Sequence, residues 1–405
     1  MPFPLRDGES IAVTQSARSL AGKGVNMDLL AFNTVKHACD IGEAQCALSH
    51  YGQLEAVPLD NRVRPTEALR NLLFSKESYH IERFVDAAYT EKLIAMLQAK
   101  RYDIVQLETI YMAPYIPVIR KHSAARIVLR AHNVEHEIWD RLTKNTQNPL
   151  KRLYLEILTN RLRTFEIDQL DRIDAMLSIS AKDDEHFRQL GYQGRSRVIP
   201  ISLNLDPYHA RHDWDAVTLS FIGSLDWFPN LEGLEWFLQN VDLEGLTCPR
   251  TGKPVEFHVA GRNPPDSIVS HPLPSLVFHG EVPEAIDFIN DHPLMVVPLF
   301  SGSGMRTKIL EAMALERVVI TTRLGLEGID AADGEEVLIA DTGVEFREKF
   351  AYLLENPDRI AMVGKAARRH IEENYDAPVV ADDLQQFLRG TIGEDETVAI
   401  SHRFA

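Results

Sequence analysis

The sequence lacks the features that would place this protein in a membrane or outside the cell. It has 405 residues and no run of about 18 apolar residues that could form a transmembrane helix. Its N-terminus shows no basic segment followed by an apolar one, as a secretory signal would. We therefore expect a cytoplasmic protein.

Cysteine is also scarce. Cys39, Cys46 and Cys248 have neither the spacing of a metal site nor the even number of a disulfide set, so we expect all three to be reduced. Apolar residues make up 45% and charged residues 25% of the chain, which is typical of a soluble globular protein. The length is enough for two domains of about 150–200 residues each.

Basic residues are too few to favour nucleic acid as a partner. The formal net charge is −16, and an acidic chain argues against nucleic-acid binding. Residues 1–200 contain 27 Lys and Arg against 25 Asp and Glu, whereas residues 201–405 contain 16 against 34. An acidic or membrane-borne partner could approach the nearly neutral first half without strong repulsion, unless this asymmetry is incidental.

The most informative stretch is Leu294–Glu316, with the sequence LMVVPLFSGSGMRTKILEAMALE. Its apolar start, Leu294–Leu299, predicts a buried parallel strand, and Met305–Ala314 predicts a helix. Between them, Gly302 and Gly304 allow positive φ and a close approach of backbone N–H groups to an anion. The stretch therefore predicts an anion site at a helix N-terminus.

Two cations, Arg306 and Lys308, follow in the expected first turn of that helix. Positive charge is unfavourable there unless a bound anion such as a diphosphate offsets it. Glu311 lies one turn further on and could accept hydrogen bonds from sugar hydroxyls. The loop matches neither G-x-x-x-x-G-K-[ST] nor G-x-G-x-x-G, so an ordinary connection with a basic surface stays open as the alternative.

A second informative stretch begins with the predicted strand Arg126–Ala131, which leads into His132. Ligands of open α/β sheets bind beyond the carboxyl ends of strands, which makes His132 a candidate site residue. His132 could instead cap backbone groups of its loop. His132 and His136 are four residues apart and could be two metal ligands, but no third ligand at a diagnostic spacing accompanies them.

Both stretches resemble the group 1 (family 4) glycosyltransferases. The segment PLFSGSGMRTKILEAMALERVVITTRLGLEGI resembles their donor site, which usually contains E-x7-E. Glu311 matches the second glutamate, and Ser303 stands at the first, as in a branch written G-S-G-x-R-x-K-[IV]-L-E-A-M-A. Residues 130–133 resemble the family's [RT]-x-H-[ND] site, and GSLDWFPN at 223–230 is similar to one subgroup.

The resemblance implies an α/β protein of the GT-B fold, with two facing Rossmann-like domains and a central cleft. We expect an acceptor-side domain over residues 1–203 and a nucleotide-sugar-binding domain over residues 204–375. Residues 376–405 would form a helix that crosses back to the first domain and a mobile tail. In the family, the loop PFPLRDG at 2–8 follows a buried strand, so we expect the first strand to be missing here through truncation or a misassigned start.

The implied activity is retaining transfer of a sugar from a nucleotide-diphospho-sugar to a glycan or lipid-linked acceptor, in polysaccharide or glycoconjugate biosynthesis. His132, Arg306 and Lys308 would act at the reaction centre, the two cations stabilising the leaving diphosphate without a metal or other cofactor. Relatives carry an Arg and a Lys after the strand at 218–222, but none occurs here between Phe221 and Cys248. The expected donor contacts are Gly8, Gly223, Gly302, Ser303, Gly304, Met305 and Glu311.

Two other functions stay open: a nucleotide-sugar 2-epimerase of the same fold, and a non-catalytic protein that binds a nucleotide sugar or glycan. The predicted amphipathic helix Asn148–Asp174 offers a further partner. Its apolar stripe could pack on the sheet, or it could give the N-terminal domain a peripheral contact with the inner face of the membrane.

Overall fold

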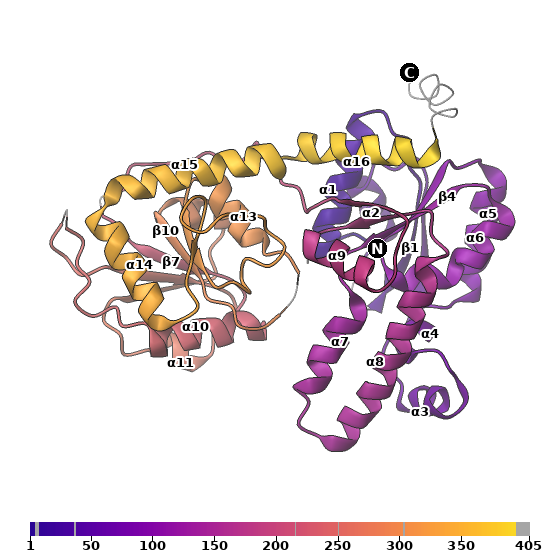
Figure 1. Cartoon of the computed structure of the whole chain (residues 1–405), viewed down its shortest axis with the longest axis horizontal. Helices are drawn as coiled ribbons and strands as arrows, with labels where there is room; N and C mark the ends of the chain where they lie inside the picture. Colours follow the sequence, from indigo (N-terminus) through magenta and orange to yellow (C-terminus); the bar gives the residue numbers. More distant parts are fainter. Residues whose placement is uncertain (5–7, 36–37, 215, 250, 303, 394–405) are drawn as a thin grey trace. The chain divides into compact units, whose positions relative to one another are not determined.

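The computed structural model describes residues 1–4, 8–35, 38–214, 216–249, 251–302 and 304–393 (Figure 1). The chain divides into two compact units. The first holds residues 1–202 and the chain from Val380 onwards, and the second holds Leu203–Val379. Both contain parallel sheets covered by helices, which confirms the predicted α/β class. Among the described residues, each helix is too short or too polar to span a bilayer.

The first unit contains two parallel sheets, with strand orders β1-β2 and β3-β4-β5-β6. Met1 is tied to the first of them, because its amino group donates to the carbonyl of Phe32 at 2.8 Å. The elements in chain order are α1 Gly8–Gly22, β1 Leu29–Thr34, α2 Ile41–Ala47, β2 Leu54–Leu59, α3 Pro65–Phe74, α4 Tyr79–Glu82, α5 Ala87–Ala99, β3 Ile104–Leu107, the 3-10 helix η2 Ile110–Tyr115, α6 Ile116–His122, β4 Arg126–Ala131, α7 Glu135–Lys144, α8 Pro149–Leu170, β5 Ala175–Ser178, α9 Ala181–Gln189, β6 Arg195–Val198 and α16 Ala377–Ile392.

Strand β4 is buried on both faces, which explains its nearly continuous apolar sequence. Ile127 and Leu129 pack in one cluster with residues of α5 and α6. Val128, on the opposite face, packs in another cluster with Leu20 of α1 and Leu384 of α16. In the same unit, α3 ends at Phe74, and a separate helix α5 begins after its N-cap, Asp86.

The second unit contains one parallel sheet of order β12-β11-β10-β7-β8-β9. The chain enters at the central strand β7 and the order reverses between β7 and β10, where ligands of open α/β sheets bind. The elements are β7 Leu219–Ile222, α10 Phe228–Asn240, β8 Phe257–Ala260, α11 Asp266–Val269, β9 Leu276–Gly280, α12 Ala285–Asn290, β10 Leu294–Val297, α13 Thr307–Ala314, β11 Val318–Thr321, β12 Leu338–Ile339, α14 Gly343–Glu355 and α15 Pro357–Asn374.

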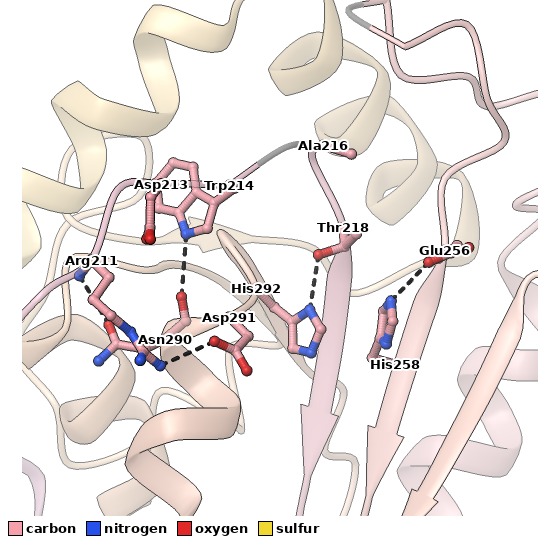
Figure 2. A pocket seen from close by; sticks show the side chains of 10 residues that line it. All are labelled: Arg211, Asp213, Trp214, Ala216, Thr218, Glu256, His258, Asn290, Asp291 and His292. Carbon is pink, nitrogen blue, oxygen red and sulfur yellow. Dashed lines mark hydrogen bonds and ion pairs between the residues drawn. The ribbon is translucent and has the colours of Figure 1, made fainter.

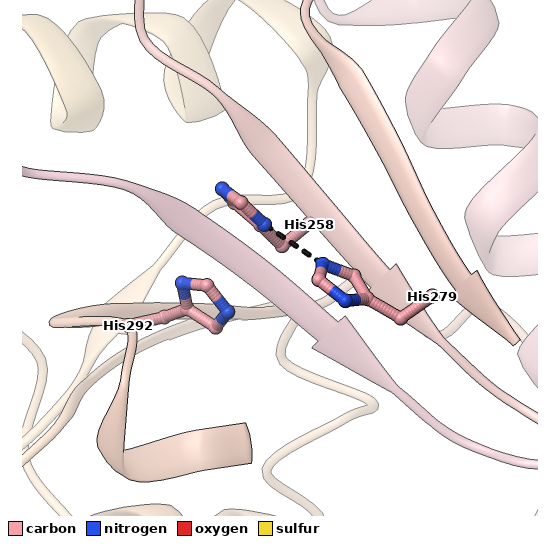
Figure 3. A group of neighbouring side chains, drawn as sticks. All are labelled: His258, His279 and His292. Atoms are coloured by element: carbon pink, nitrogen blue, oxygen red, sulfur yellow. Dashed lines mark hydrogen bonds between the residues drawn. The ribbon is translucent and has the colours of Figure 1, made fainter. Parts of the chain in front are cut away.

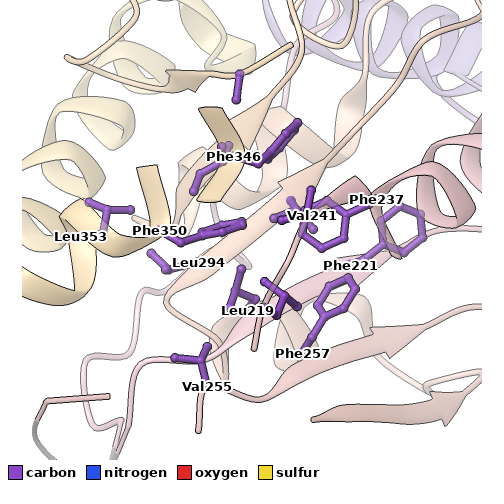
Figure 4. Packing of buried hydrophobic residues seen from close by; sticks show 14 of the residues in the cluster. Leu219, Phe221, Phe237, Val241, Val255, Phe257, Leu294, Phe346, Phe350 and Leu353 are labelled. Carbon is purple, nitrogen blue, oxygen red and sulfur yellow. The ribbon is translucent and has the colours of Figure 1, made fainter. Parts of the chain in front are cut away.

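An aromatic core holds α10 and α14 against one face of this sheet (Figure 4). The ring of Phe237 lies 5.1 Å from that of Phe257 and 5.5 Å from that of Phe346, measured between centroids. All three side chains are fully buried, and each contributes about 1.5–3 kcal/mol by its removal from water. This packing fixes β7 and α10, the two elements that position the candidate site.

Candidate functional site

Several predicted site residues follow the carboxyl ends of β7 and β10, which pair as neighbours in the second unit. Gly223 follows β7 directly. Gly302 and Gly304 lie in the loop after β10 with φ of 96° and 82°, a region that favours glycine. Met305 is half-buried in the same loop, and Ser303 lies outside the described residues.

Helix α13 begins at Thr307, two residues later than predicted. Arg306 is its N-cap residue, with φ −92° and ψ 91°, because the loop backbone is still extended at this position. The prediction that both cations lie in the first helical turn is therefore right for Lys308 and wrong for Arg306. The Arg306 side chain is buried, and its guanidinium donates a hydrogen bond to the carbonyl of Gly304.

The amine of Lys308 reaches back to the end of β7. Its Nζ donates to the carbonyl of Ile222 at 3.1 Å and to Oδ1 of Asn230 at 2.7 Å, and it lies 4.9 Å from the ring centre of Phe221. Burial and the positive charge of Arg306 lower the pKa of Lys308 to about 7. The negative charge of Glu311 acts in the opposite direction. An anion bound beside this amine would favour its charged form.

Asn230 is a site residue that the sequence did not single out. It lies on α10, where its side chain accepts the Lys308 hydrogen bond and donates from Nδ2 to the carbonyl of Ser224 at 2.9 Å. A Cβ on Gly223 would stand only 2.7 Å from Asn230 Nδ2 and 2.9 Å from Lys308 Nζ. Glycine at 223 therefore makes the room in which these two side chains meet. The available signal was the final Asn of GSLDWFPN.

Glu311 is half-buried on α13 and accepts a hydrogen bond from the hydroxyl of Tyr208 at 3.1 Å. Burial raises the pKa of Glu311, while the Tyr208 hydrogen bond and the charge of Lys308 oppose that rise. Its contact with a sugar hydroxyl stays a prediction. Gly8, the remaining expected donor contact, begins α1 in the first unit.

His132 belongs to the first unit, where it follows β4 and is buried. Its Nε2 lies 3.1 Å from Oε2 of Glu108, which follows the neighbouring strand β3. Burial alone would raise the pKa of Glu108, but the His132 hydrogen bond and the charge of Arg130 hold it below its ordinary value. The carboxylate can therefore fix the orientation and the tautomer of the His132 ring.

A second buried network surrounds His136. Its Nδ1 lies 2.5 Å from Oε2 of Glu166, whose carboxylate also accepts the backbone N–H of Glu135 at 3.1 Å. The Glu135 carboxylate accepts a hydrogen bond from Tyr111 at 2.8 Å, and burial, with repulsion from other acids, raises its pKa to about 7. His132 and His136 thus face different glutamates, which disfavours the alternative that they bind one metal together.

A pocket of about 360 Å³ opens at the amino ends of the strands in the second unit's sheet, opposite the carboxyl ends that carry Gly223 and the glycine loop (Figure 2). Thr218, which precedes β7, and His292, which precedes β10, lie in its wall. None of the predicted site residues that the structure describes lines it. The lining residues are Arg211, Asp213, Trp214, Ala216, Thr218, Glu256, His258, Asn290, Asp291 and His292.

Part of the second unit matches a known protein family. Residues 216–356 match the family model described as "Glycosyl transferases group 1". Over 301 residues the chain is 26% identical to an uncharacterized 44.6 kDa protein in the cps region of Klebsiella pneumoniae, covering 70% of this chain and 74% of that protein.

Solved structures share the fold across nearly the whole chain. Sucrose-phosphate synthase from Thermosynechococcus elongatus superposes with a TM-score of 0.66 at 15% identity, covering 95% of this chain and 93% of that one. HepE of Anabaena, solved in complex with UDP, gives a TM-score of 0.63 at 12% identity, covering 93% and 96%. The expected fold is therefore confirmed: the chain has the GT-B fold, and residues 216–356 match the group 1 glycosyl transferase model.

Proposed function

We propose that the protein transfers a sugar, with retention of configuration, from a nucleotide-diphospho-sugar to a glycan or lipid-linked acceptor in polysaccharide or glycoconjugate biosynthesis. The observation that carries the proposal is the amine of Lys308, held at the carboxyl end of β7 beside a glycine loop and a helix N-terminus. The UDP complex of HepE and the cps region of the Klebsiella relative support the donor and the pathway class.

The chemistry requires stabilisation of the negative charge that grows on the leaving diphosphate. Lys308 and Arg306 supply positive charge, and backbone N–H groups around Gly302 and Gly304 supply donors that need no metal ion. His132, oriented by Glu108, would contact the donor sugar as the glycosidic bond breaks. The acceptor hydroxyl would attack from the face that the diphosphate leaves.

A thermal-shift panel of UDP-, GDP-, ADP- and TDP-sugars tests the donor. A ligand at 100 times its Kd stabilises the folded protein by about 2.7 kcal/mol, so the correct nucleotide should raise Tm clearly above the others. A donor that is converted without any acceptor would favour the 2-epimerase. A donor that binds but is never consumed, with any acceptor fraction, would favour the non-catalytic alternative.

Gly223→Ala should weaken both folding and nucleotide binding. The new methyl group would overlap Asn230 Nδ2 and Lys308 Nζ, and overpacking of this kind costs about 1–3 kcal/mol. Thermal unfolding and titration calorimetry with the donor measure the two effects. Gly22→Ala is the matched control, since a Cβ there meets nothing within 4 Å. Equal behaviour of the two variants would contradict the packing described for Gly223.

We also propose that the first unit touches an anionic membrane surface where the acceptor is a lipid-linked glycan. Helices α3 and α8 are tied together, because Arg161 of α8 donates to the carbonyl of Leu72 at 3.1 Å. Both expose large apolar side chains, and Phe74 is 84% exposed. Lys and Arg near these side chains suit anionic headgroups. The exposed apolar residues are Leu69, Leu73, Phe74, Leu150 and Leu153.

The double variant Phe74→Ser, Leu150→Ser should bind vesicles of phosphatidylglycerol and phosphatidylcholine about tenfold more weakly than the parent, because it removes two exposed apolar groups. Cosedimentation measures the binding. Val344→Ser, which changes an apolar side chain of similar exposure in the second unit, should have no effect. Unchanged binding of the double variant, or equal loss in the control, would refute this contact.

A further inference from the structure

Three histidines from separate segments of the second unit converge on one point (Figure 3). His258 lies on β8, His279 on β9, and His292 between α12 and β10. His258 pairs with Val277, and His279 is the extra residue at the register shift that follows, between the partners of Val259 and Ala260. One ring nitrogen from each histidine lies within 4.8 Å of the other two. His258 Nδ1 is 2.9 Å from His279 Nε2, and the His292 ring stacks on His258 with centroids 4.2 Å apart.

The other ring nitrogens of two of these histidines already have polar partners (Figure 2). Nε2 of His258 lies 3.2 Å from a carboxylate oxygen of Glu256, and Nδ1 of His292 lies 2.9 Å from the hydroxyl of Thr218. Nδ1 of His258, which faces Nε2 of His279, and Nε2 of His292 are then the nitrogens that a shared ligand would use. Metal-binding histidines almost always use their second nitrogen in this way, bonded to a carboxylate or another oxygen that fixes the tautomer.

We propose that His258, His279 and His292 bind a divalent transition-metal ion, with Zn²⁺ as the principal candidate. Three imidazoles suit zinc, which completes a tetrahedron with a water molecule or another ligand. Zinc–nitrogen bonds of about 2.0–2.1 Å place the ligand nitrogens about 3.3 Å apart. The His258 and His279 nitrogens, 2.9 Å apart, would have to separate slightly, and any ligand nitrogens that lie as far as 4.8 Å apart would have to approach. The exposed side chain of His279 has room to move.

The site is separate from the proposed reaction centre. Thr218 precedes β7 and Gly223 follows it, and the five residue steps from one to the other span about 16 Å of extended chain. The ion would join β9, the edge strand of the sheet, to β8 and to the connection that leads into β10. The expected role of the ion is to hold β9 in place at the edge of the sheet. This role does not depend on which sugar the enzyme transfers.

The test uses the full-length protein without a polyhistidine tag, stripped with EDTA and then titrated with Zn²⁺. We expect about one equivalent to bind and to raise Tm. His279→Ala should abolish both effects, and its fold is not at risk because the side chain is exposed. His209→Ala is the control, since this exposed histidine of the same unit uses its backbone N–H and carbonyl for hydrogen bonds.

Glu256→Gln should retain all three ligands yet weaken Zn²⁺ binding by about 10–100-fold, the usual effect of losing an outer-shell carboxylate. Co²⁺ in place of Zn²⁺ should give visible absorption of a tetrahedral centre in the parent and not in His279→Ala. The proposal is overturned if the stripped protein binds no stoichiometric Zn²⁺, or if His279→Ala binds it as tightly as the parent. The histidines would then be a hydrogen-bonded cluster only.

Discussion

Lys308→Met is expected to weaken binding of the nucleotide donor by roughly 5- to 150-fold, equivalent to about 1–3 kcal/mol. The amine of Lys308 is fixed at the end of β7 by the carbonyl of Ile222 and the side chain of Asn230, so it is already in place for a diphosphate. Methionine keeps the apolar stem and removes only the charge and the hydrogen bonds. Titration calorimetry with the nucleoside diphosphate measures the loss.

The pH dependence of binding tests the same residue independently. The pKa of Lys308 is about 7 in the free protein, so the uncharged amine prevails above that pH. A bound diphosphate favours the ammonium form and raises this pKa. Binding at pH 8 should therefore take up a proton, the measured enthalpy should depend on the buffer, and affinity should fall as pH rises above 7.

Lys365→Met, which removes an exposed lysine on α15, is the matched control and should leave affinity and proton uptake unchanged. Arg306→Ala should also weaken binding, by a similar free energy, because its guanidinium lies beneath the glycine loop. If Lys308→Met and Arg306→Ala both bind the donor like the parent, the diphosphate does not lie at this loop.

His132→Ala should lower kcat by about 10²–10³-fold while leaving the donor Kd nearly unchanged, as expected for a group whose contact strengthens in the transition state. Glu108→Gln should lower kcat less than His132→Ala does. It should also shift the pH dependence of kcat, because Glu108 acts by orienting the His132 ring. Single-turnover rates and equilibrium binding separate the two quantities.

His122→Ala, at the end of α6 in the same unit, controls for a general effect of losing a histidine. A His132→Ala enzyme with normal kcat and a raised donor Kd would make His132 a binding residue. A Glu108→Gln enzyme with an unchanged pH profile would remove the orienting role from Glu108.

The sequence predicted the strand–loop–helix unit well because its signals are local. Leu294–Val297 is a short apolar run, and Gly302 and Gly304 mark the loop whose positive φ the structure shows. The start of α13 was missed because the extended backbone of Arg306 comes from the loop and is not encoded in helix propensity. The sequence also contains no local pattern that predicts contacts between residues far apart in the chain. Lys308 and Asn230 are 78 residues apart in the chain.

The histidine cluster shows the same limit. Its members are 258, 279 and 292, a spacing that matches no familiar metal motif, and only the register of β8 with β9 brings them together. The two-sheet arrangement of the first unit was likewise not foreseen in detail, because strand pairing depends on long-range packing. Pattern and motif thus predict which elements exist, and tertiary structure decides which side chains meet.

The most direct test of the central claim is release of nucleoside diphosphate from the donor that the binding panel identifies, measured with and without glycan or lipid-linked acceptors. Release is expected only when an acceptor is present, the glycosidic bond of the product should have the anomeric configuration of the donor, and His132→Ala should release far less nucleoside diphosphate. An inverted product would contradict the retaining mechanism. Conversion of the donor in the absence of acceptor, or binding without any turnover, would contradict glycosyl transfer itself.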